Sequence, residues 1–329
     1  MKRRRCVWIA VALAGLLTAG IATALGVVLV RRNRPWKAFN AGLETHEPYF
    51  LEFQENGGAL TIDLPQRSPI ELQLWSVDTG ECRVKRGFPD YRGQFIDWCG
   101  QNDLILNNSL SCIRAVSLTT GNVVGGFDRN DEQHVGVGFV TRSDLIAASF
   151  HDRIELVRLD GSVVQTLRFP GYETKDGFIS FSASASYVTA HGFVWSTRDG
   201  KLIARLPENA SVVGDTRSGA LVLVTKVNDE SVLGVYSIPS FRLLHEIARD
   251  PQLSASLSDS GDRVVIRRPS RIDVYSVDTA EVLRRIPFSP PKTENDDGER
   301  WPLITISFAG DRVALGFPGG RVEVWEIPP

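Results

Sequence analysis

Three features of the 329-residue sequence predict an all-β fold, a seven-bladed β-propeller of four-stranded blades preceded by one transmembrane α-helix. A similar segment recurs seven times at intervals of about 40 residues, each segment alternates apolar and polar residues as strands do, and no long amphipathic helix interrupts the series. We therefore divide the chain into a basic tail at 1–5, a membrane span at 6–30, a linker at 31–35 and a propeller at 36–329.

The expected membrane span at 6–30 contains 25 consecutive residues without a charge, and basic clusters lie at both of its ends. A helix of this length measures about 37 Å, enough to cross a hydrocarbon core of about 30 Å. The alternative is a cleaved signal peptide, because Ala22, Thr23 and Ala24 fit a small-residue cleavage site, but the apolar run continues to Val30. We expect a single-pass membrane protein with its short basic tail in the cytoplasm and its propeller on the non-cytoplasmic side.

The repeated segment is a short hydrophobic alternation that ends in a tight turn. One copy runs from Leu72 to Gly80 and another from Ile113 to Gly121. The fourth residues of the segments, which we use as markers, are spaced by 41, 41, 38, 41, 39 and 50 residues. The markers are Trp75, Val116, Val157, Trp195, Tyr236, Tyr275 and Trp325. Units of this size cannot bury both faces alone, so seven of them are expected to stack side by side and close a ring.

Each unit is expected to contain four strands. Two alternating runs precede the marker, such as 303–308 and 312–317 in the last unit, and a hairpin and a final strand follow it. In the last unit the third strand at 322–327 is followed by two prolines, which cannot pair as a fourth strand. We expect the segment at about 36–47 to pair with 322–327, since the ring would otherwise keep an unpaired edge and a gap.

The last unit, from Ile306 to Glu326, resembles a WD-repeat blade. It has the order strand, turn, strand, Gly-rich turn and a strand that ends in an aromatic residue followed by an acid. The resemblance covers roughly residues 49–329 and implies a propeller fold. The chain departs from the family at the aspartate that follows the marker, where other residues stand: Ser76, Ser196, Ser237, Ser276 and Glu326. The Gly-His dipeptide expected before each first strand is also absent, so the internal hydrogen-bond network of the family is not carried over.

A second family competes for the same repeats. The segment from Ala115 to Val124 also resembles a blade of the pyrroloquinoline-quinone type. That family places a tryptophan soon after the Thr-Gly pair, and none stands at 83–88 or at 123–127. We therefore favour the WD-repeat resemblance, and both resemblances imply a propeller.

The charge distribution argues against nucleic acid as a partner. Residues 1–37 hold eight of the 37 Lys and Arg residues and no acid, so 38–329 carries 29 basic residues against 39 acidic ones. Binding to phosphate groups needs concentrated positive charge, which an acidic domain does not supply.

No catalytic, cofactor-binding or metal-binding motif is complete, so we expect no enzyme activity, no cofactor and no metal site. His245 and Glu246 begin a zinc-protease motif, but Arg249 stands where its second histidine belongs. The cysteines beyond the membrane span are odd in number and lack a Cys-x-x-Cys pair, which favours buried thiols. These cysteines are Cys82, Cys99 and Cys112.

The loops that join one unit to the next are the expected binding surface. Two of them raise a tyrosine beside a charged residue, and a tryptophan closes an acidic insertion at 293–299. Exposed tyrosine, tryptophan and arginine are common anchors of protein interfaces. The candidate interface residues are Tyr91, Arg92, Tyr172, Glu173 and Trp301. The alternative is that the tyrosines cover the outer edges of the blades.

The sequence therefore predicts a membrane-anchored scaffold that binds a protein or peptide partner without catalysis. We expect a monomer, and a helix-mediated dimer is the alternative because Gly15 and Ala19 are spaced at four residues in the span. The alternative function is a membrane-anchored propeller enzyme or small-ligand binder with its site over the central channel. An enzyme needs convergent ionisable groups with perturbed pKa values, whereas a scaffold needs exposed loop residues.

Overall fold

The computed structural model describes the following residues: 34–41, 50–54, 58–64, 70–88, 94–99, 104–109, 112–128, 136–139, 145–150, 152–170, 180–181, 186–190, 192–207, 209–227, 230–251, 253–289, 302–307 and 309–329. The chain separates into two units, Met1–Trp36 and Lys37–Pro329. The predicted basic tail, the predicted membrane span at 6–30 and most of the linker at 31–35 lie outside the described residues. Within the described residues, no helix is long and apolar enough to cross a membrane.

The described residues form 28 strands in seven antiparallel sheets of four strands each. The first three sheets contain β2 (Phe50–Gln54), β3 (Ala59–Leu64), β4 (Ile70–Ser76) and β5 (Cys82–Phe88); β6 (Gln94–Cys99), β7 (Leu104–Ser109), β8 (Cys112–Ser117) and β9 (Val123–Asp128); and β10 (Gly136–Phe139), β11 (Leu145–Ser149), β12 (Arg153–Arg158) and β13 (Val163–Arg168). The all-β class and the seven four-stranded units predicted from the marker spacing are confirmed.

The other four sheets complete this series. The fourth to sixth sheets contain β14 (Ser180–Phe181), β15 (Tyr187–Ala190), β16 (Phe193–Ser196) and β17 (Leu202–Arg205); β18 (Ala210–Asp215), β19 (Leu221–Val227), β20 (Glu230–Tyr236) and β21 (Leu243–Asp250); and β22 (Ser254–Leu257), β23 (Arg263–Arg268), β24 (Arg271–Ser276) and β25 (Val282–Pro287). The last sheet contains β26 (Leu303–Ile306), β27 (Arg312–Gly316), β28 (Arg321–Glu326) and β1 (Lys37–Asn40).

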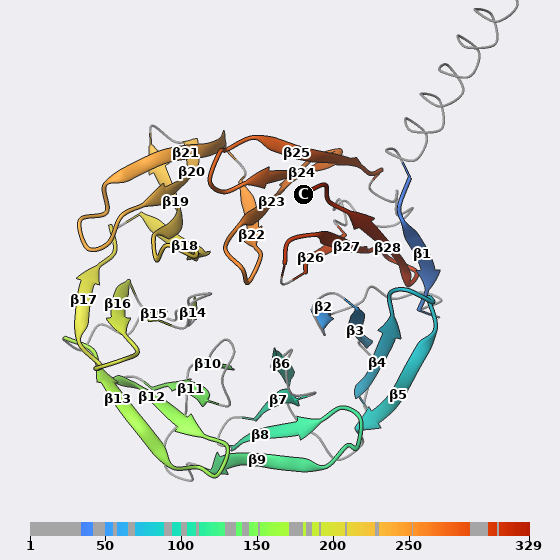
Figure 1. The fold of residues 1–329 in the computed structure, drawn as a ribbon. Coiled ribbons are helices and arrows are strands. Elements are labelled where there is room, and N and C mark those ends of the chain that lie inside the picture. Colours follow the sequence, from blue (N-terminus) through green and yellow to red (C-terminus); the bar gives the residue numbers. More distant parts are fainter. Residues whose placement is uncertain are drawn as a thin grey trace, which may run out of the picture. The chain divides into compact units, whose positions relative to one another are not determined.

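Within Lys37–Pro329, the seven sheets follow one another in chain order, with the first strand of each on the inside and the fourth on the outside (Figure 1). First strands of neighbouring sheets are in contact: β6 touches β10, β14 touches β18, β18 touches β22, and β22 touches β26. The first strand of the last sheet, β26, also touches β2 of the first sheet. The contacts therefore bring the last sheet of the series back to the first.

The hydrophobic core lies between neighbouring sheets. Val274 of β24 and Trp325 of β28 belong to one cluster of buried side chains, and Leu106 of β7 and Val157 of β12 belong to another. Both faces of a middle strand are covered in this arrangement, so its residues are buried in succession rather than alternately. In β24, for example, every residue after Arg271 is buried.

Six sheets share one irregularity at the predicted marker. The pairing between the third and fourth strands shifts by one residue beside the marker, as between Leu74 and Trp75 in the first sheet. The same shift occurs beside the other markers that precede a fourth strand: Val116, Val157, Trp195, Tyr236 and Tyr275. An extra residue in one strand of a pair increases the local twist. The bulge therefore repeats with the period of the sequence.

The last sheet joins the two ends of the described domain. The four residues of β1, from Lys37 to Asn40, pair antiparallel with β28. The pairing that the sequence predicts between these two segments is therefore present over the length of β1. The Phe39 ring of β1 also stacks on the Trp75 ring of the first sheet, with 4.8 Å between ring centroids. One short strand thus contacts both the last sheet and the first.

Candidate functional site

The predicted interface residues lie outside the described residues, and so does the acidic insertion at 293–299. These residues are Tyr91, Arg92, Tyr172, Glu173 and Trp301.

The expectation of buried thiols is wrong for Cys82, which is exposed. Cys82 begins β5, the outer strand of its sheet, and an edge strand is not covered on its free side.

The carboxyls with shifted pKa values lie in outer strands and turns and do not converge. A hydrogen bond from Arg114 lowers the pKa of Asp128 at the end of β9, and one from Arg249 lowers the pKa of Glu246 in β21. A lowered pKa keeps a carboxyl charged at neutral pH, whereas a general acid needs a raised one. In the described part of the chain, no group of three or more His, Cys, Asp or Glu side chains is placed to hold a metal ion.

Asp273 in β24 is a buried carboxylate surrounded by arginines. Its side chain is 2% exposed and lies 2.8 Å from Nε of Arg271 and 3.5 Å from Nε of Arg268. Arg268 also pairs with Asp250, at the end of the outer strand of the preceding sheet. A charge is tolerated in the interior when it is paired and hydrogen-bonded. These pairs link two sheets, which gives the buried carboxylate a structural role.

The serines that follow the markers cap the turns between third and fourth strands. Ser76 Oγ accepts a hydrogen bond from the Thr79 N–H at 3.3 Å, and Ser117 Oγ accepts one from the Thr120 N–H at 3.1 Å. A hydroxyl that bonds a backbone N–H two or three residues on is a common way to hold a tight turn. Serine therefore satisfies the local turn at the position that follows the marker.

Outer strands also reach the turn of the next sheet, a contact that we call a clasp. Arg86 of β5 donates hydrogen bonds of 2.5 to 3.0 Å to the three consecutive carbonyls of 118–120. His245 of β21 donates from Nε2 to the carbonyl of Val277 at 2.6 Å. Both side chains span the gap between two sheets and hold the turn that follows a third strand.

Two further clasps use different chemistry. The Gln165 amide of β13 lies 2.7 Å from the carbonyl of Thr197 and 2.5 Å from the N–H of Gly200, in the orientation that turns its nitrogen toward the carbonyl. In the second sheet the backbone itself approaches the next turn, and the Gly126 N–H donates to the carbonyl of Leu159 at 2.8 Å. Guanidinium, imidazole, carboxamide and peptide groups therefore serve the same purpose.

Exposed aliphatic side chains gather at the starts of outer strands. In five sheets the first residue of the fourth strand is a valine or leucine that is more than a third exposed, and in three of them so is the second. These residues are Val123, Val124, Val163, Val164, Leu202, Leu243, Leu244 and Val282. They lie at the bulge, because each first residue is opposite a marker, as Val282 is opposite Tyr275.

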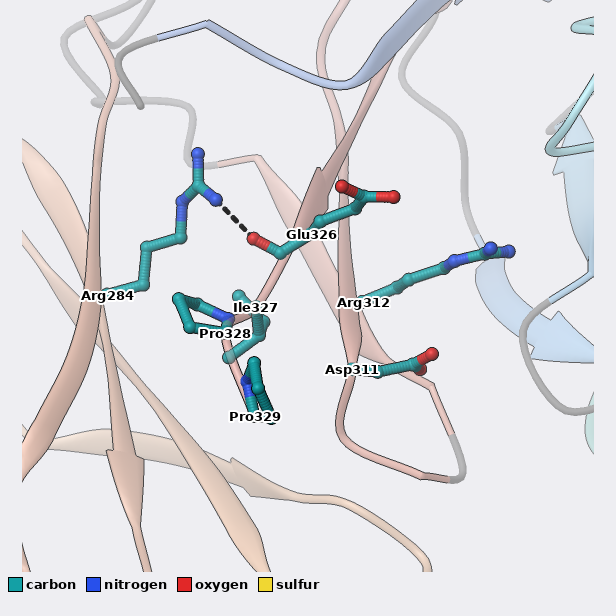
Figure 2. A pocket seen from close by; sticks show the side chains of 7 residues that line it. All are labelled: Arg284, Asp311, Arg312, Glu326, Ile327, Pro328 and Pro329. Atoms are coloured by element: carbon teal, nitrogen blue, oxygen red, sulfur yellow. Dashed lines mark hydrogen bonds between the residues drawn. The ribbon is translucent and has the colours of Figure 1, made fainter. Parts of the chain in front are cut away.

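A hollow of about 320 Å³ lies between the outer strand of the sixth sheet and the end of β28 (Figure 2). Its lining residues are Arg284, Asp311, Arg312, Glu326, Ile327, Pro328 and Pro329. Arg284 extends from β25 and donates a hydrogen bond to the carbonyl of Glu326 (Figure 2). Its guanidinium also lies over the Trp325 ring, 5.2 Å from the centroid. Among the side chains of the lining, two arginines and two carboxylates balance in charge.

Contacts outside the hollow hold two of these charged side chains. The Asp311 carboxylate accepts a hydrogen bond of 2.6 Å from the Ser307 hydroxyl. Nη1 of Arg312 lies 3.7 Å from the carboxylate of Asp78, which belongs to a turn of the first sheet. The hollow is therefore built at the place where the last sheet meets both of its neighbours.

A smaller hollow of about 120 Å³ lies beside the first strands β22 and β26. It is lined by Ser254, Ser256, Val265, Arg267, Pro302, Leu303 and Ile304. One guanidinium and two hydroxyls are its polar groups, and the residues described around it include no carboxylate.

No family model matches this chain, and no curated protein matches its sequence.

The larger hollow was not anticipated from the sequence. A signal for it was present, because the predicted pairing of 36–47 with 322–327 leaves the last sheet without a turn between its third and fourth strands. Geometry is the basis of the functional proposal below.

Proposed function

We propose that the chain is a membrane-anchored, seven-bladed, WD-repeat-like β-propeller that acts as a non-catalytic scaffold for a protein or peptide partner. In this proposal residues 6–30 are the single-pass anchor, and the propeller lies on the non-cytoplasmic side. Residues 38–329 contain more acidic than basic side chains, so the proposed partner is not a nucleic acid.

Contacts between the sheets support the propeller. Each sheet has four strands in up-and-down order, first strands of neighbouring sheets touch, and β26 touches β2. A series of stacked sheets has two exposed ends unless the last one returns to the first. Here β1 belongs to the last sheet, and its Phe39 ring stacks on Trp75 of the first. A closed ring accounts for both observations.

The placement of the ionisable side chains is the observation that favours a scaffold over an enzyme. The carboxyls with lowered pKa values lie in outer strands and turns, and the buried Asp273 is paired with arginines of its own sheet. The exposed aliphatic side chains and the larger hollow lie toward the outside of the series of sheets instead. Recognition surfaces combine apolar contact with a few polar groups, and these regions supply both.

The smaller hollow favours the second candidate function, a small-ligand site near the middle of the ring. Its arginine and two serines suit an anionic group, and first strands border it. At about 120 Å³ it is well below the volume of about 300 Å³ that small-molecule pockets usually reach. The scaffold is therefore the preferred function.

Proximity labelling in the native membrane tests the scaffold. A labelling enzyme is fused after Pro329 of the full chain, and the matched control fuses it after residue 35, so that both share the same anchor. We expect the full chain to enrich a small set of proteins over the control. The triple variant Tyr91→Ala, Tyr172→Ala and Trp301→Ala should lose that set while its thermal unfolding stays nearly unchanged.

Two results would count against the proposal. If the full chain enriches nothing over the anchor alone, the domain does not bind a protein in that membrane. If the triple variant unfolds, the aromatics are structural, and the variant Val163→Thr, Val164→Thr then tests the exposed aliphatic surface without removing a core side chain. A cytoplasm-specific reporter fused after Pro329 should stay silent, and strong activity would reverse the proposed orientation.

A further inference from the structure

The junction between the last two sheets differs from the others in what lies beside the outer strand. In the first six sheets the third strand turns directly into the fourth, through four to six residues, as at 118–122 and 277–281. Clasps from a preceding sheet hold these turns, as Arg86 holds the first and His245 holds the second. A turn therefore fills the space that faces the preceding outer strand.

The last sheet has no such turn among the described residues. Its fourth strand is β1, which comes from the other end of the domain, so β28 is not joined to its outer neighbour. After β28 the chain continues as Ile327, Pro328 and Pro329, and the Ile327 N–H donates to the carbonyl of Asp311 at 2.7 Å. The larger hollow occupies the place of the turn.

Arg284 stands at the clasp position of this junction. In β25 it lies opposite the residue that precedes the marker, which is also the position of Gln165 in β13 and His245 in β21. Those two side chains bond the carbonyl of a turn in the next sheet. Arg86, the other arginine that forms a clasp, bonds three consecutive turn carbonyls.

We infer that the larger hollow binds a tight turn presented by the partner protein, with the Arg284 guanidinium donating to the carbonyls of that turn. The inference rests on the proposed function for the nature of the partner and adds the chemistry of the segment that is recognised. The chain itself contains the model for this contact, since Arg86 holds the turn at 118–122 in the same way. Guanidinium groups suit this task because they donate several hydrogen bonds from one plane.

The charge and the volume of the larger hollow indicate which kind of turn it can bind. The lining side chains carry two positive and two negative charges, so they offer no net attraction to a charged turn and favour an uncharged segment. A volume of about 320 Å³ admits a few residues rather than a folded surface. The turn at 118–122 has the sequence Leu-Thr-Thr-Gly-Asn, which carries no charge and adopts the required conformation. It therefore provides a probe of known shape.

Peptide binding tests the inference directly. The probe is a fluorescent cyclic peptide with the sequence of residues 116–124, and fluorescence anisotropy measures its binding to the full chain in detergent. We expect the neutral peptide to bind, and the same peptide with aspartate in place of both threonines to bind at least about fivefold more weakly. Arg284→Ala should weaken binding about tenfold or more. Arg285→Ala is the matched control, because its side chain is 67% exposed, lies outside the lining and should leave binding unchanged.

A second variant separates recognition from folding. Arg284→Ala also removes the hydrogen bond to Glu326 and the contact with Trp325, so its thermal unfolding must be measured alongside. Pro328→Trp leaves Arg284 in place and fills the hollow from an exposed position, and it should weaken binding as well. The inference is overturned if the wild-type chain does not bind the peptide, or if both folded variants bind it as the wild type does.

The scaffold and the turn receptor can fail separately. If proximity labelling finds a partner but the peptide does not bind, the scaffold proposal stands and recognition of a turn is wrong. If the full chain self-associates and Pro328→Trp abolishes that association, the occupant is a second copy of the chain, which overturns the assignment to a partner protein. If the peptide binds and the labelling finds no partner, the hollow recognises a turn but the proposed scaffold is not supported.

Discussion

Two arginines of outer strands, Arg86 and Arg284, stand at different positions in the register and have different surroundings. Each extends from an outer strand toward the next sheet, but Arg86 donates to three carbonyls of a complete turn, whereas Arg284 donates to the carbonyl of Glu326 and lies over an aromatic ring beside a hollow. The difference arises because the fourth strand of the last sheet comes from the other end of the domain. A contact that holds a turn within the regular repeat thus lies beside a hollow where the repeat is interrupted.

Among the changes that test this comparison, removal of β1 should have the largest effect on the stability of the domain. Deletion of Lys37 to Asn40 removes the whole pairing with β28 and the stacking of Phe39 on Trp75. We expect the unfolding temperature of the domain to fall by several degrees, as for a loss of a few kcal/mol. Calorimetry of the full chain measures it, and Phe39→Ala should give a smaller decrease because the strand remains. An unchanged melting curve would contradict the role of β1 in joining the last sheet to the first.

Adding a side chain at Gly126, the residue whose N–H makes the backbone clasp, should have the next largest effect. A Cβ at Gly126 would lie 2.1 Å from the carbonyl oxygen of Ile113 in β8 of the same sheet, and the residue has a φ of +137° that favours glycine. We expect Gly126→Ala to lower the free energy of unfolding by about 2–4 kcal/mol in denaturant titrations. The control is Gly192→Ala, where φ is +80° but the space is open, and about 1 kcal/mol is expected. Equal losses at the two glycines would mean that the close approach of Gly126 is unimportant.

Replacing Arg86 and Arg284 one at a time compares directly how much each arginine contributes to stability. Arg86→Ala removes three hydrogen bonds between sheets and should destabilise the domain by about 1–3 kcal/mol, whereas Arg284→Ala removes the bond to the Glu326 carbonyl and should cost about 1 kcal/mol or less. Arg86→Lys keeps the charge but not the planar group of donors, so it should recover only part of the loss. If Arg284→Ala proves as destabilising as Arg86→Ala in denaturant titrations, both arginines are structural.

The smallest effect is expected at Asp199, in the turn at 197–201, where a substitution should change how the unfolding temperature depends on pH. Hydrogen bonds from Ser196 and Lys201 lower the pKa of Asp199 below its ordinary value of 3.8. The stabilisation is therefore complete above pH 3.8 and is lost as the pH falls through the pKa of the folded state. We expect Asp199→Asn to reduce the decrease in unfolding temperature between about pH 5 and about pH 2. A variant with the wild-type decrease would show that the exposed carboxylate contributes nothing to the turn.

The sequence was most informative where the evidence is local. The period of the markers predicted the seven units, and Trp75 and Tyr275 do lie at the same bulge of their sheets. The pairing of 36–47 with 322–327 was also accessible, because a missing fourth strand is visible from the order of the repeats alone. Alternation of apolar residues and turn residues such as Gly80 depend on neighbours in sequence, so they leave a pattern that can be recognised.

The candidate site was not accessible in the same way. Arg284 and Arg312 are separated along the chain and have ordinary surroundings in sequence, and they line one hollow because two sheets meet there. The buried Asp273 is another example, since nothing near it in sequence indicates that the preceding sheet supplies Asp250 to the same group of charges. Such contacts depend on how sheets stack, which the period of the repeat does not specify.

The sequence by itself determined the number of units, the strands within each and the strand that completes the last sheet, because these follow from local alternation, turn chemistry and the count of strands. Only the tertiary structure decided how neighbouring sheets are held together. Gln165, His245 and Arg284 share one position in the register although they differ in chemistry. The physical reason is that a turn carbonyl accepts a hydrogen bond from any N–H donor that reaches it, so no single residue type marks the contact.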